Sequence, residues 1–276
     1  MHSNLTLRIL SILVLAPVVI GAIWFGDPVY NCLLAVLGAG LAWEWEQMIL
    51  KRNTVSGIIM ATAASITAFV LPINSVLAFL TILVAAVWVY WRSHWNISLA
   101  FGTLYICFPV AAMAYIYYIS GQHYNAVPPK EIIYWLLFVV WATDIGGYVV
   151  GKTVGGPKLC PKISAKKTWA GLFGAIGFAM AVAYFFALYL KANEYAVTKA
   201  VPFDRLQWVL VLSAGLLAIV SQAGDFFESF IKRKLGLKDS SNIIPGHGGL
   251  FDRVDGLLFA AMFTAVALYF LNLWIM

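Results

Sequence analysis

Apolar stretches separated by short polar turns run along the whole sequence. A helix needs about 20 apolar residues to cross the hydrocarbon core of a bilayer. The third and fourth stretches are separated only by a turn around Leu71-Pro72-Ile73, so a re-entrant pair is the alternative there. The sequence therefore predicts an all-α, polytopic transmembrane helix bundle of about nine spans. These candidate spans are residues 5–25, 29–50, 55–71, 73–91, 97–119, 132–150, 170–190, 206–226 and 256–275.

The composition agrees with a membrane protein. The chain is 62% hydrophobic with a mean hydropathy of +0.87, values outside the range of soluble globular proteins. We find no linker rich in Gly, Ser or Pro, no low-complexity tract and no internal repeat. We therefore expect one membrane domain over residues 1–276, with mostly apolar spans in 1–131 and most of the clustered polar residues in 132–276.

The basic residues are distributed unequally between the two sides of the predicted bundle. With nine spans, 14 of the 18 Lys and Arg fall on the side of the amino terminus and 4 on the other. The positive-inside rule then places the amino terminus and both basic loops in the cytoplasm. Such a localised basic surface suits anionic lipid headgroups or nucleotides. No nucleic-acid-binding pattern accompanies it, so we do not expect nucleic acid as a partner.

Acidic residues occur where the neighbouring residues indicate hydrocarbon. Asp144, Asp225 and Glu228 lie in apolar surroundings, and each would cost about 2.5–3.5 kcal/mol at a helix centre. At 100° per residue a polar stripe forms on one helical face, which we expect to point into a polar cavity. The alternative is that Asp225, Glu228 and Lys232 neutralise one another within the helix. The stripe consists of Ser221, Asp225, Glu228, Ser229 and Lys232.

Two further acidic patterns have helical spacing. Asp144 shares a face with residues 148 and 151, and Gly146 and Gly147 beside it permit close backbone approach. Asp252 and Asp255 are one turn apart at the entry to the last span. Several carboxylates without clustered histidines or thiols suit a hard cation, above all Mg²⁺.

The first basic loop, residues 151–171, contains five lysines and a predicted helix start near Ser164–Thr168. A helix amino terminus with adjacent lysines binds phosphate readily. The alternative is a positive loop that only sets topology. The run GGYVVGKT, residues 146–153, fits the Walker A spacing, but its first half ends a membrane span. We therefore interpret this match as accidental, since a Walker A loop follows a strand.

The second basic loop, residues 232–255, contains eight charged side chains in 24 positions. His247 lies in a PGHGG turn, where it is placed to bond a substrate. Opposite charges this close in sequence suit a polyanion held through both a metal and direct contacts. The alternative is a solvated loop with internal salt bridges. Further upstream, Glu44 and Glu46 lie near residues 51 and 52, Lys and Arg, and we expect an interfacial salt network there, with a functional role as the alternative.

The run SFIKRKLGLKDSSNIIPGHGGLFDRVD, residues 229–255, resembles the signature of the phosphatidate cytidylyltransferases, also called CDP-diacylglycerol synthases. It contains that family's Ser, Lys-Arg, Lys-Asp, His-Gly-Gly and Asp-Arg-x-Asp elements without departure. SAKKTWAG and DIGGYVVGK resemble further motifs of the family. The likeness covers the carboxyl-terminal half, whereas the amino-terminal half agrees mainly in hydropathy.

This resemblance implies that CTP and phosphatidate give CDP-diacylglycerol and pyrophosphate, with Mg²⁺ required and K⁺ possible beside it. It also implies a helical bundle in a bacterial-type inner membrane, often a homodimer among membrane lipids, with its site facing the cytoplasm. The rivals are an ion-coupled secondary transporter and a CTP-dependent polyprenol kinase. The transporter's paired broken helices in two repeated halves are not seen.

The resemblance places the metal-binding acids at Asp225 and Asp252, and we add Asp144 and Asp255 as candidate ligands. We expect the catalytic residues to be Asp225, Asp252, Lys167, Lys232 and His247. The expected substrate-binding residues are Ser164, Lys166, Lys167, Thr168, Ser229, Lys232, Arg233, Lys238, Asp239, His247, Gly248, Gly249 and Arg253.

Overall fold

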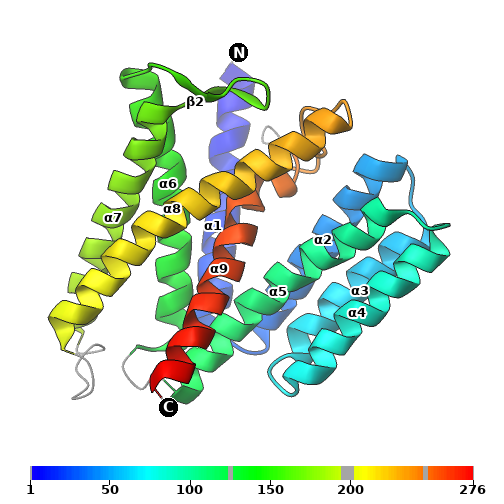
Figure 1. Cartoon of the computed structure of the whole chain (residues 1–276), viewed down its shortest axis with the longest axis horizontal. Helices are drawn as coiled ribbons and strands as arrows, with labels where there is room; N and C mark the ends of the chain where they lie inside the picture. The colour runs from blue at the N-terminus through cyan, green and yellow to red at the C-terminus, as the bar shows by residue number, and fades with distance from the viewer. Residues whose placement is uncertain (1, 124–126, 194–201, 245–247, 276) are drawn as a thin grey trace. The chain divides into compact units, whose positions relative to one another are not determined.

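The structure is a computed structural model that describes residues 2–123, 127–193, 202–244 and 248–275 (Figure 1). Over these residues it contains nine α-helices and one two-stranded hairpin. The helices are α1 (His2–Phe25), α2 (Val29–Leu50), α3 (Val55–Val70), α4 (Ser75–Arg92), α5 (Ile97–His123), α6 (Pro129–Thr153), α7 (Trp169–Ala192), α8 (Phe203–Lys234) and α9 (Phe251–Ile275).

Each predicted apolar stretch coincides with one of these helices, which confirms the all-α polytopic fold. Helices satisfy their own backbone hydrogen bonds, as a segment surrounded by hydrocarbon must. Within the described residues, seven helices are long and apolar enough to cross a membrane. α3 has only 16 residues, fewer than the roughly 20 that a span requires. The protein is therefore an integral membrane protein.

The chain divides into two compact units. Unit 1 is Met1–Tyr115 with Ile231–Val254, and unit 2 is Ile116–Phe230 with Asp255–Met276. We describe each unit by itself. The single membrane domain expected from the sequence stays a prediction.

Unit 1 contains an aromatic core that holds the start of α9. The ring of Trp45 on α2 lies 5.6 Å from that of Tyr105 on α5 and 5.8 Å from that of Phe251, between ring centroids. Tyr105 and Phe251 are stacked, with their centroids 5.9 Å apart. Gly102 makes room for this arrangement, because a Cβ there would lie 2.0 Å from Nε1 of Trp45. The first residue of α9 is thus fixed against α2 and α5.

In unit 2, glycines bring α6 and α7 into close contact. A Cβ added to Gly146 would lie 2.6 Å from the carbonyl oxygen of Gly174, and one added to Gly171 would lie 2.9 Å from that of Gly147. Small residues allow such backbone contact between membrane helices, where dispersion rather than the hydrophobic effect drives association. The predicted role of Gly146 is confirmed, whereas a Cβ added to Gly147 would have no neighbour closer than 3.6 Å.

Glycines also mark the crossing of α8 and α9 in unit 2. A Cβ on Gly224 would lie 2.6 Å from the carbonyl oxygen of Asp255, and one on Gly256 would lie 2.4 Å from Oγ of Ser221. Each glycine is the sequence neighbour of an acid, Asp225 on α8 and Asp255 on α9. The crossing therefore brings these two carboxylate-bearing positions together.

A β-hairpin connects α6 to α7 (Figure 1). Its strands are β1 (Lys158–Cys160) and β2 (Ser164–Thr168), paired antiparallel with Cys160 opposite Ser164. The helix start predicted near Ser164–Thr168 is confirmed at the end of that range, although residues 164–168 themselves extend to pair with β1. The helix begins at Trp169, and Thr168 is its N-cap, because Oγ1 of Thr168 accepts a hydrogen bond from Gly171 N at 3.0 Å. The Walker-like run 146–153 lies wholly within α6, which agrees with an accidental match.

Candidate active site

Two groups of polar side chains account for most of the predicted site residues. The first, in unit 2, is the acidic cluster, and the second, in unit 1, is the α9 entry. The acidic cluster consists of Asp144, Asp225, Glu228 and Asp255. The α9 entry consists of Ser240, Ser241, Gly249, Leu250, Phe251 and Asp252, the residues at and before the start of α9.

The polar stripe predicted on α8 is turned inward. Ser221, Glu228 and Lys232 are 1%, 2% and 7% exposed. Buried charges in an apolar helix require partners. Asp225 and Lys232 both find such partners outside α8, in Lys167 and Asp252 respectively. Neutralisation confined to the helix thus does not account for the stripe. Whether it faces a cavity stays a prediction.

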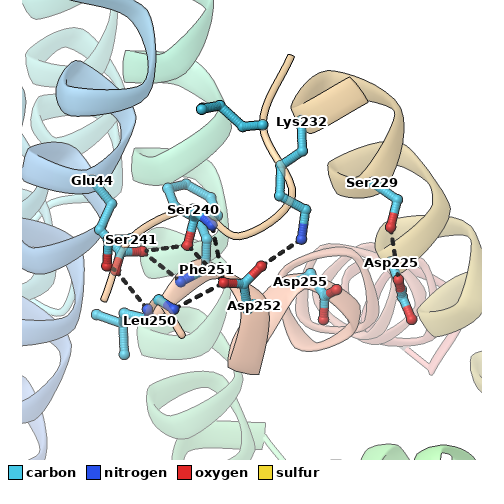
Figure 2. Close-up of polar contacts among 12 residues, drawn as sticks. Glu44, Asp225, Ser229, Lys232, Ser240, Ser241, Leu250, Phe251, Asp252 and Asp255 are labelled. Atoms are coloured by element: carbon cyan, nitrogen blue, oxygen red, sulfur yellow. Dashed lines mark hydrogen bonds and ion pairs between the residues drawn. The ribbon is translucent and has the colours of Figure 1, made fainter. Parts of the chain in front are cut away.

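Asp225 is bound by the hairpin. Its Oδ2 lies 2.5 Å from Nζ of Lys167, which β2 carries to the side of α8. Ser229, one turn along α8, donates a hydrogen bond from Oγ to Oδ1 of Asp225 at 3.3 Å (Figure 2). The Lys167 ammonium also lies 4.5 Å from the ring centroid of Phe226, a cation–π contact. The predicted catalytic residues Lys167 and Asp225 are thus in direct contact.

The other acidic residues lie around Asp255. Its carboxylate is close enough to Asp225, Glu228 and Asp144 to interact with the charge of each. Its Oδ1 accepts a hydrogen bond from Gly256 N at 2.7 Å. Like charges this close repel one another, so a positive group in their midst is stabilised. Helices α6, α8 and α9 each contribute to this negative region.

The donor set of the acidic cluster fits Mg²⁺, because it offers hard carboxylate oxygens. Among the residues that the structure describes, no three His, Cys, Asp or Glu side chains are placed to hold a metal ion together. Proteins commonly hold Mg²⁺ through one or two carboxylates, with water and substrate phosphates completing the shell. The acidic cluster thus offers the kind of oxygen ligand that Mg²⁺ prefers, and a magnesium site here stays a prediction.

Asp252 organises the α9 entry (Figure 2). Its Oδ1 forms an ion pair with Nζ of Lys232, and both side chains are nearly buried. Its Oδ2 accepts hydrogen bonds from Gly249 N at 2.8 Å and from Ser240 N at 3.0 Å. The same carboxylate thus binds a cation on one oxygen and holds two backbone segments on the other. The structure brings together the predicted residues Lys232, Gly249 and Asp252.

Glu44 also contacts the α9 entry, although the sequence pattern predicted an interfacial salt network for it. It is 0% exposed, and its carboxylate accepts hydrogen bonds from Leu250 N at 2.6 Å and Phe251 N at 2.7 Å (Figure 2). The expected salt network with Lys51 and Arg52 was wrong, because both glutamates are buried and accept hydrogen bonds from backbone N–H groups, whereas the two basic side chains are exposed. The sequence signal that could have indicated a buried role for Glu44 was the presence of an acidic residue inside an apolar span.

Glu46, the other acid of the pair, is also buried. It accepts hydrogen bonds from Thr54 N at 3.0 Å and Gly57 N at 2.8 Å, at the start of α3. The two glutamates therefore hold the starts of different helices. Such carboxylates satisfy N–H groups that have no partner in the first helical turn.

The remaining predicted residues are near these groups or on the surface. Ser164 is half-buried and Lys166 is exposed, both on β2, while Thr168 is buried as the cap of α7. Arg233 is exposed, and its guanidinium donates to the carbonyl oxygen of Leu237 at 2.8 Å.

The rest of the signature run lies between α8 and the start of α9. Lys238, Asp239 and Arg253 are exposed. Gly248 has φ of +89°, a conformation that glycine adopts without strain. His247 lies outside the described residues.

The fold and these side chains define an integral membrane protein in which each unit pairs a lysine with a carboxylate, Lys232 with Asp252 and Lys167 with Asp225. The Cytidylyltransferase family model matches residues 6–271. The chain therefore belongs to the cytidylyltransferase family and is a nucleotidyltransferase.

Named relatives match along nearly their whole length. The chain is 33% identical over 266 residues to the phosphatidate cytidylyltransferase of Brucella suis biovar 1 (strain 1330), covering 94% of this chain and 91% of the relative. It is 32% identical over 274 residues to that of Rickettsia bellii (strain RML369-C), covering 98% and 91%. It is 30% identical over 279 residues to that of Pseudomonas aeruginosa, covering 95% and 96%.

Proposed function

We propose that this chain transfers CMP from CTP to phosphatidate, giving CDP-diacylglycerol and pyrophosphate in phospholipid biosynthesis. The similarity to phosphatidate cytidylyltransferases over more than nine-tenths of both chains carries this proposal. The site supports it through its pairing of lysines with carboxylates. Lysines neutralise phosphate groups, and carboxylates bind the cation that accompanies a nucleotide.

The reaction needs no nucleophile from the protein. A phosphate oxygen of phosphatidate attacks the α-phosphorus of CTP and forms the new P–O bond. The bond from that phosphorus to the bridging oxygen breaks, and its electron pair leaves with pyrophosphate. Catalysis then rests on positioning the substrates and neutralising their charge.

Basic side chains of both basic loops supply that neutralisation. Lys166 and Lys167 on β2, and Lys232 and Arg233 at the end of α8, are assigned to the phosphates of CTP and phosphatidate. Nζ of Lys167 lies beside the carboxylate of Asp225, and Nζ of Lys232 lies beside that of Asp252. These two lysines are positioned before a substrate arrives, which lowers the entropic cost of binding it.

Asp225 and Asp252 are the first candidates for Mg²⁺, and Asp144 and Asp255 are the further ones. One or two of these carboxylates would hold the ion, with water and substrate phosphates completing its shell, and K⁺ would bind beside it. When bound, Mg²⁺ neutralises phosphate charge and favours departure of pyrophosphate. Asp225 would then exchange part of its contact with Lys167 for the metal. Glu228, which interacts with Asp255, adds to the negative potential that attracts the ion.

We also propose the setting of the reaction. Phosphatidate keeps its acyl chains in the bilayer while its headgroup reaches an aqueous nucleotide, so the site belongs at a membrane surface. The excess of Lys and Arg in the loops assigns that surface to the cytoplasmic face of a bacterial inner membrane. A homodimer is the proposed assembly.

Product analysis with purified full-length protein, CTP, phosphatidate and Mg²⁺ tests the proposal. Release of pyrophosphate with formation of CDP-diacylglycerol is expected. Release of CDP upon addition of a polyprenol would instead identify a lipid kinase. Ion-driven solute uptake into vesicles without nucleotide turnover would identify a transporter.

A further inference from the structure

The amino terminus of α9 is occupied by carboxylates of the protein itself. Three successive backbone N–H groups, those of Gly249, Leu250 and Phe251, donate to Asp252, Glu44 and Glu44 in turn. Such N–H groups have no partner within a helix, and with the helix dipole they form a favourable site for an anion. Glu44 fills that site, so a substrate phosphate does not need to be placed there.

Two hydroxyl groups extend this contact into the preceding segment. Ser241 Oγ donates to Oε1 of Glu44 at 2.5 Å, and Ser240 Oγ lies 3.2 Å from Oε2. Each carboxylate oxygen thus has one backbone and one hydroxyl partner. Hydrogen bonds to a buried carboxylate are stronger than those between neutral groups, because one partner is charged.

Ser240 connects Glu44 to Asp252, one of the predicted catalytic residues. Its hydroxyl lies 3.1 Å from Oδ2 of Asp252 as well as 3.2 Å from Glu44, and its N–H donates to the same Oδ2 at 3.0 Å. A displacement of the Glu44 carboxylate therefore displaces a group that Asp252 also uses. Asp252 in turn holds Lys232 through its other oxygen.

The α9 entry and α2 are closely packed around Glu44. A Cβ added to Gly249 would lie 1.7 Å from Ser240 Oγ and 2.8 Å from Oε1 of Glu44. One turn before Glu44 on α2, a Cβ on Gly40 would lie 2.8 Å from Cδ2 of Leu250. The α9 entry is therefore held against α2 by both polar and steric contacts.

We propose that Glu44 is a positioning residue for CMP transfer, which holds the α9 entry on α2 and thereby sets the positions of Asp252 and Lys232. This inference rests on the proposed function. It assigns a role in the reaction to the amino-terminal half of the chain, some 200 residues from the signature run. Glu44 itself contacts no substrate in this account.

The chain offers a closely matched control in Glu46. It lies on the same helix, is equally buried and also holds a helix start through backbone N–H groups, but that helix is α3. Glu44→Gln and Glu46→Gln each replace a buried carboxylate, which only accepts hydrogen bonds, with an amide. The amide NH₂ group is a donor and would face the backbone N–H donors that the carboxylate now binds. Both are expected to lower the melting temperature, because each leaves buried N–H groups without an acceptor.

Three measurements on the full-length protein separate the two variants: kcat and KM for CTP, the melting temperature, and hydrogen exchange at amides 248–251. For Glu44→Gln we expect kcat to fall about tenfold or more and exchange at these amides to rise. For Glu46→Gln we expect kcat within about twofold of wild type, with exchange rising near the start of α3 instead. Equal losses of kcat in the two variants, or unchanged exchange at 248–251 in Glu44→Gln, would overturn the proposal.

A milder variant tests the same coupling in case Glu44→Gln does not fold. Ser240→Ala removes only the hydroxyl shared by the two carboxylates, and we expect a smaller fall in kcat with the melting temperature nearly retained. Unchanged kcat in folded Ser240→Ala would count against the coupling. If wild-type protein made no CDP-diacylglycerol, the proposed function would fail, while exchange at 248–251 would still decide whether Glu44 holds the α9 entry.

Discussion

Lys232 and Asp252 form a nearly buried ion pair that joins the last turn of α8 to the first turn of α9. A buried ion pair is weak evidence of net stability, because desolvating two charges offsets much of their attraction. Removing one partner is nevertheless costly, because the other is left buried and uncompensated. The pair is therefore best understood as a device that fixes the position of both groups.

Replacing Lys232 with Met is expected to lower turnover by about 100-fold or more, because both a phosphate partner and the counterion of Asp252 are lost. Unfolding is expected to become easier by about 3–5 kcal/mol, as for other broken buried pairs. Lys234→Met, two residues further on and exposed, is the control and should change neither quantity. CDP-diacylglycerol formation and thermal unfolding measure the two effects. Wild-type turnover in folded Lys232→Met would contradict the assignment.

Asp225→Asn is expected to raise the Mg²⁺ concentration required for half-maximal turnover by about tenfold or more, because a charged oxygen ligand is lost. Asp204→Asn provides the comparison, since Asp204 is an exposed acid in the first turn of the same helix. A magnesium titration of the rate for both variants is the measurement. If Asp225→Asn followed the wild-type titration curve, Asp225 would not be a ligand.

Chelation gives a further prediction for the wild-type enzyme. Excess EDTA is expected to abolish turnover, and added Mg²⁺ to restore it, because phosphate charge would otherwise remain unneutralised. The helical fold should persist, since helix packing rather than the metal holds it. Circular dichroism and the rate, followed in the same sample, check both statements. Full turnover in excess chelator would refute a divalent-ion requirement.

Gly174→Ala is expected to destabilise the packing of α6 on α7 by about 1–3 kcal/mol, because its Cβ would lie 2.4 Å from Cβ of Val150. Gly177→Ala lies one turn along α7 with nothing within 4 Å of its added Cβ. That control is expected to leave stability unchanged or to raise it slightly, because alanine favours a helix over glycine. Melting temperatures in one detergent compare the pair. Equal melting temperatures would argue against close α6–α7 packing.

The helices could be predicted from the sequence because span length and apolarity are local properties. The hairpin could not, since β1 has three residues and β2 five, too few for an alternating pattern, and lysines make the segment resemble a loop. The start of α7 was predictable, because Thr168, at the end of the predicted range, is its N-cap. The glycine contacts of α6 were predictable, because hydrocarbon favours small residues where helices meet.

The site was predictable in part. Asp225 was predictable because a charged residue inside a predicted span is costly unless it has a function or a partner. Asp252 lies before the last predicted span and was indicated by the resemblance to the family. Their partners were not predictable from spacing, since Lys167 precedes Asp225 by more than fifty residues and reaches it only through β2. Glu44 was assigned to nearby basic residues, whereas its partners lie 196 to 207 positions away. Such pairings depend on tertiary packing that no local pattern encodes.

The position of the radiolabel after reaction with labelled CTP tests the central claim most directly. Purified protein would be incubated with phosphatidate and Mg²⁺, once with CTP labelled at the α-phosphate and once with CTP labelled at the γ-phosphate. The account predicts α-label in the lipid fraction and γ-label in pyrophosphate. Label from the γ-phosphate in lipid, or no label in lipid from either CTP, would contradict it.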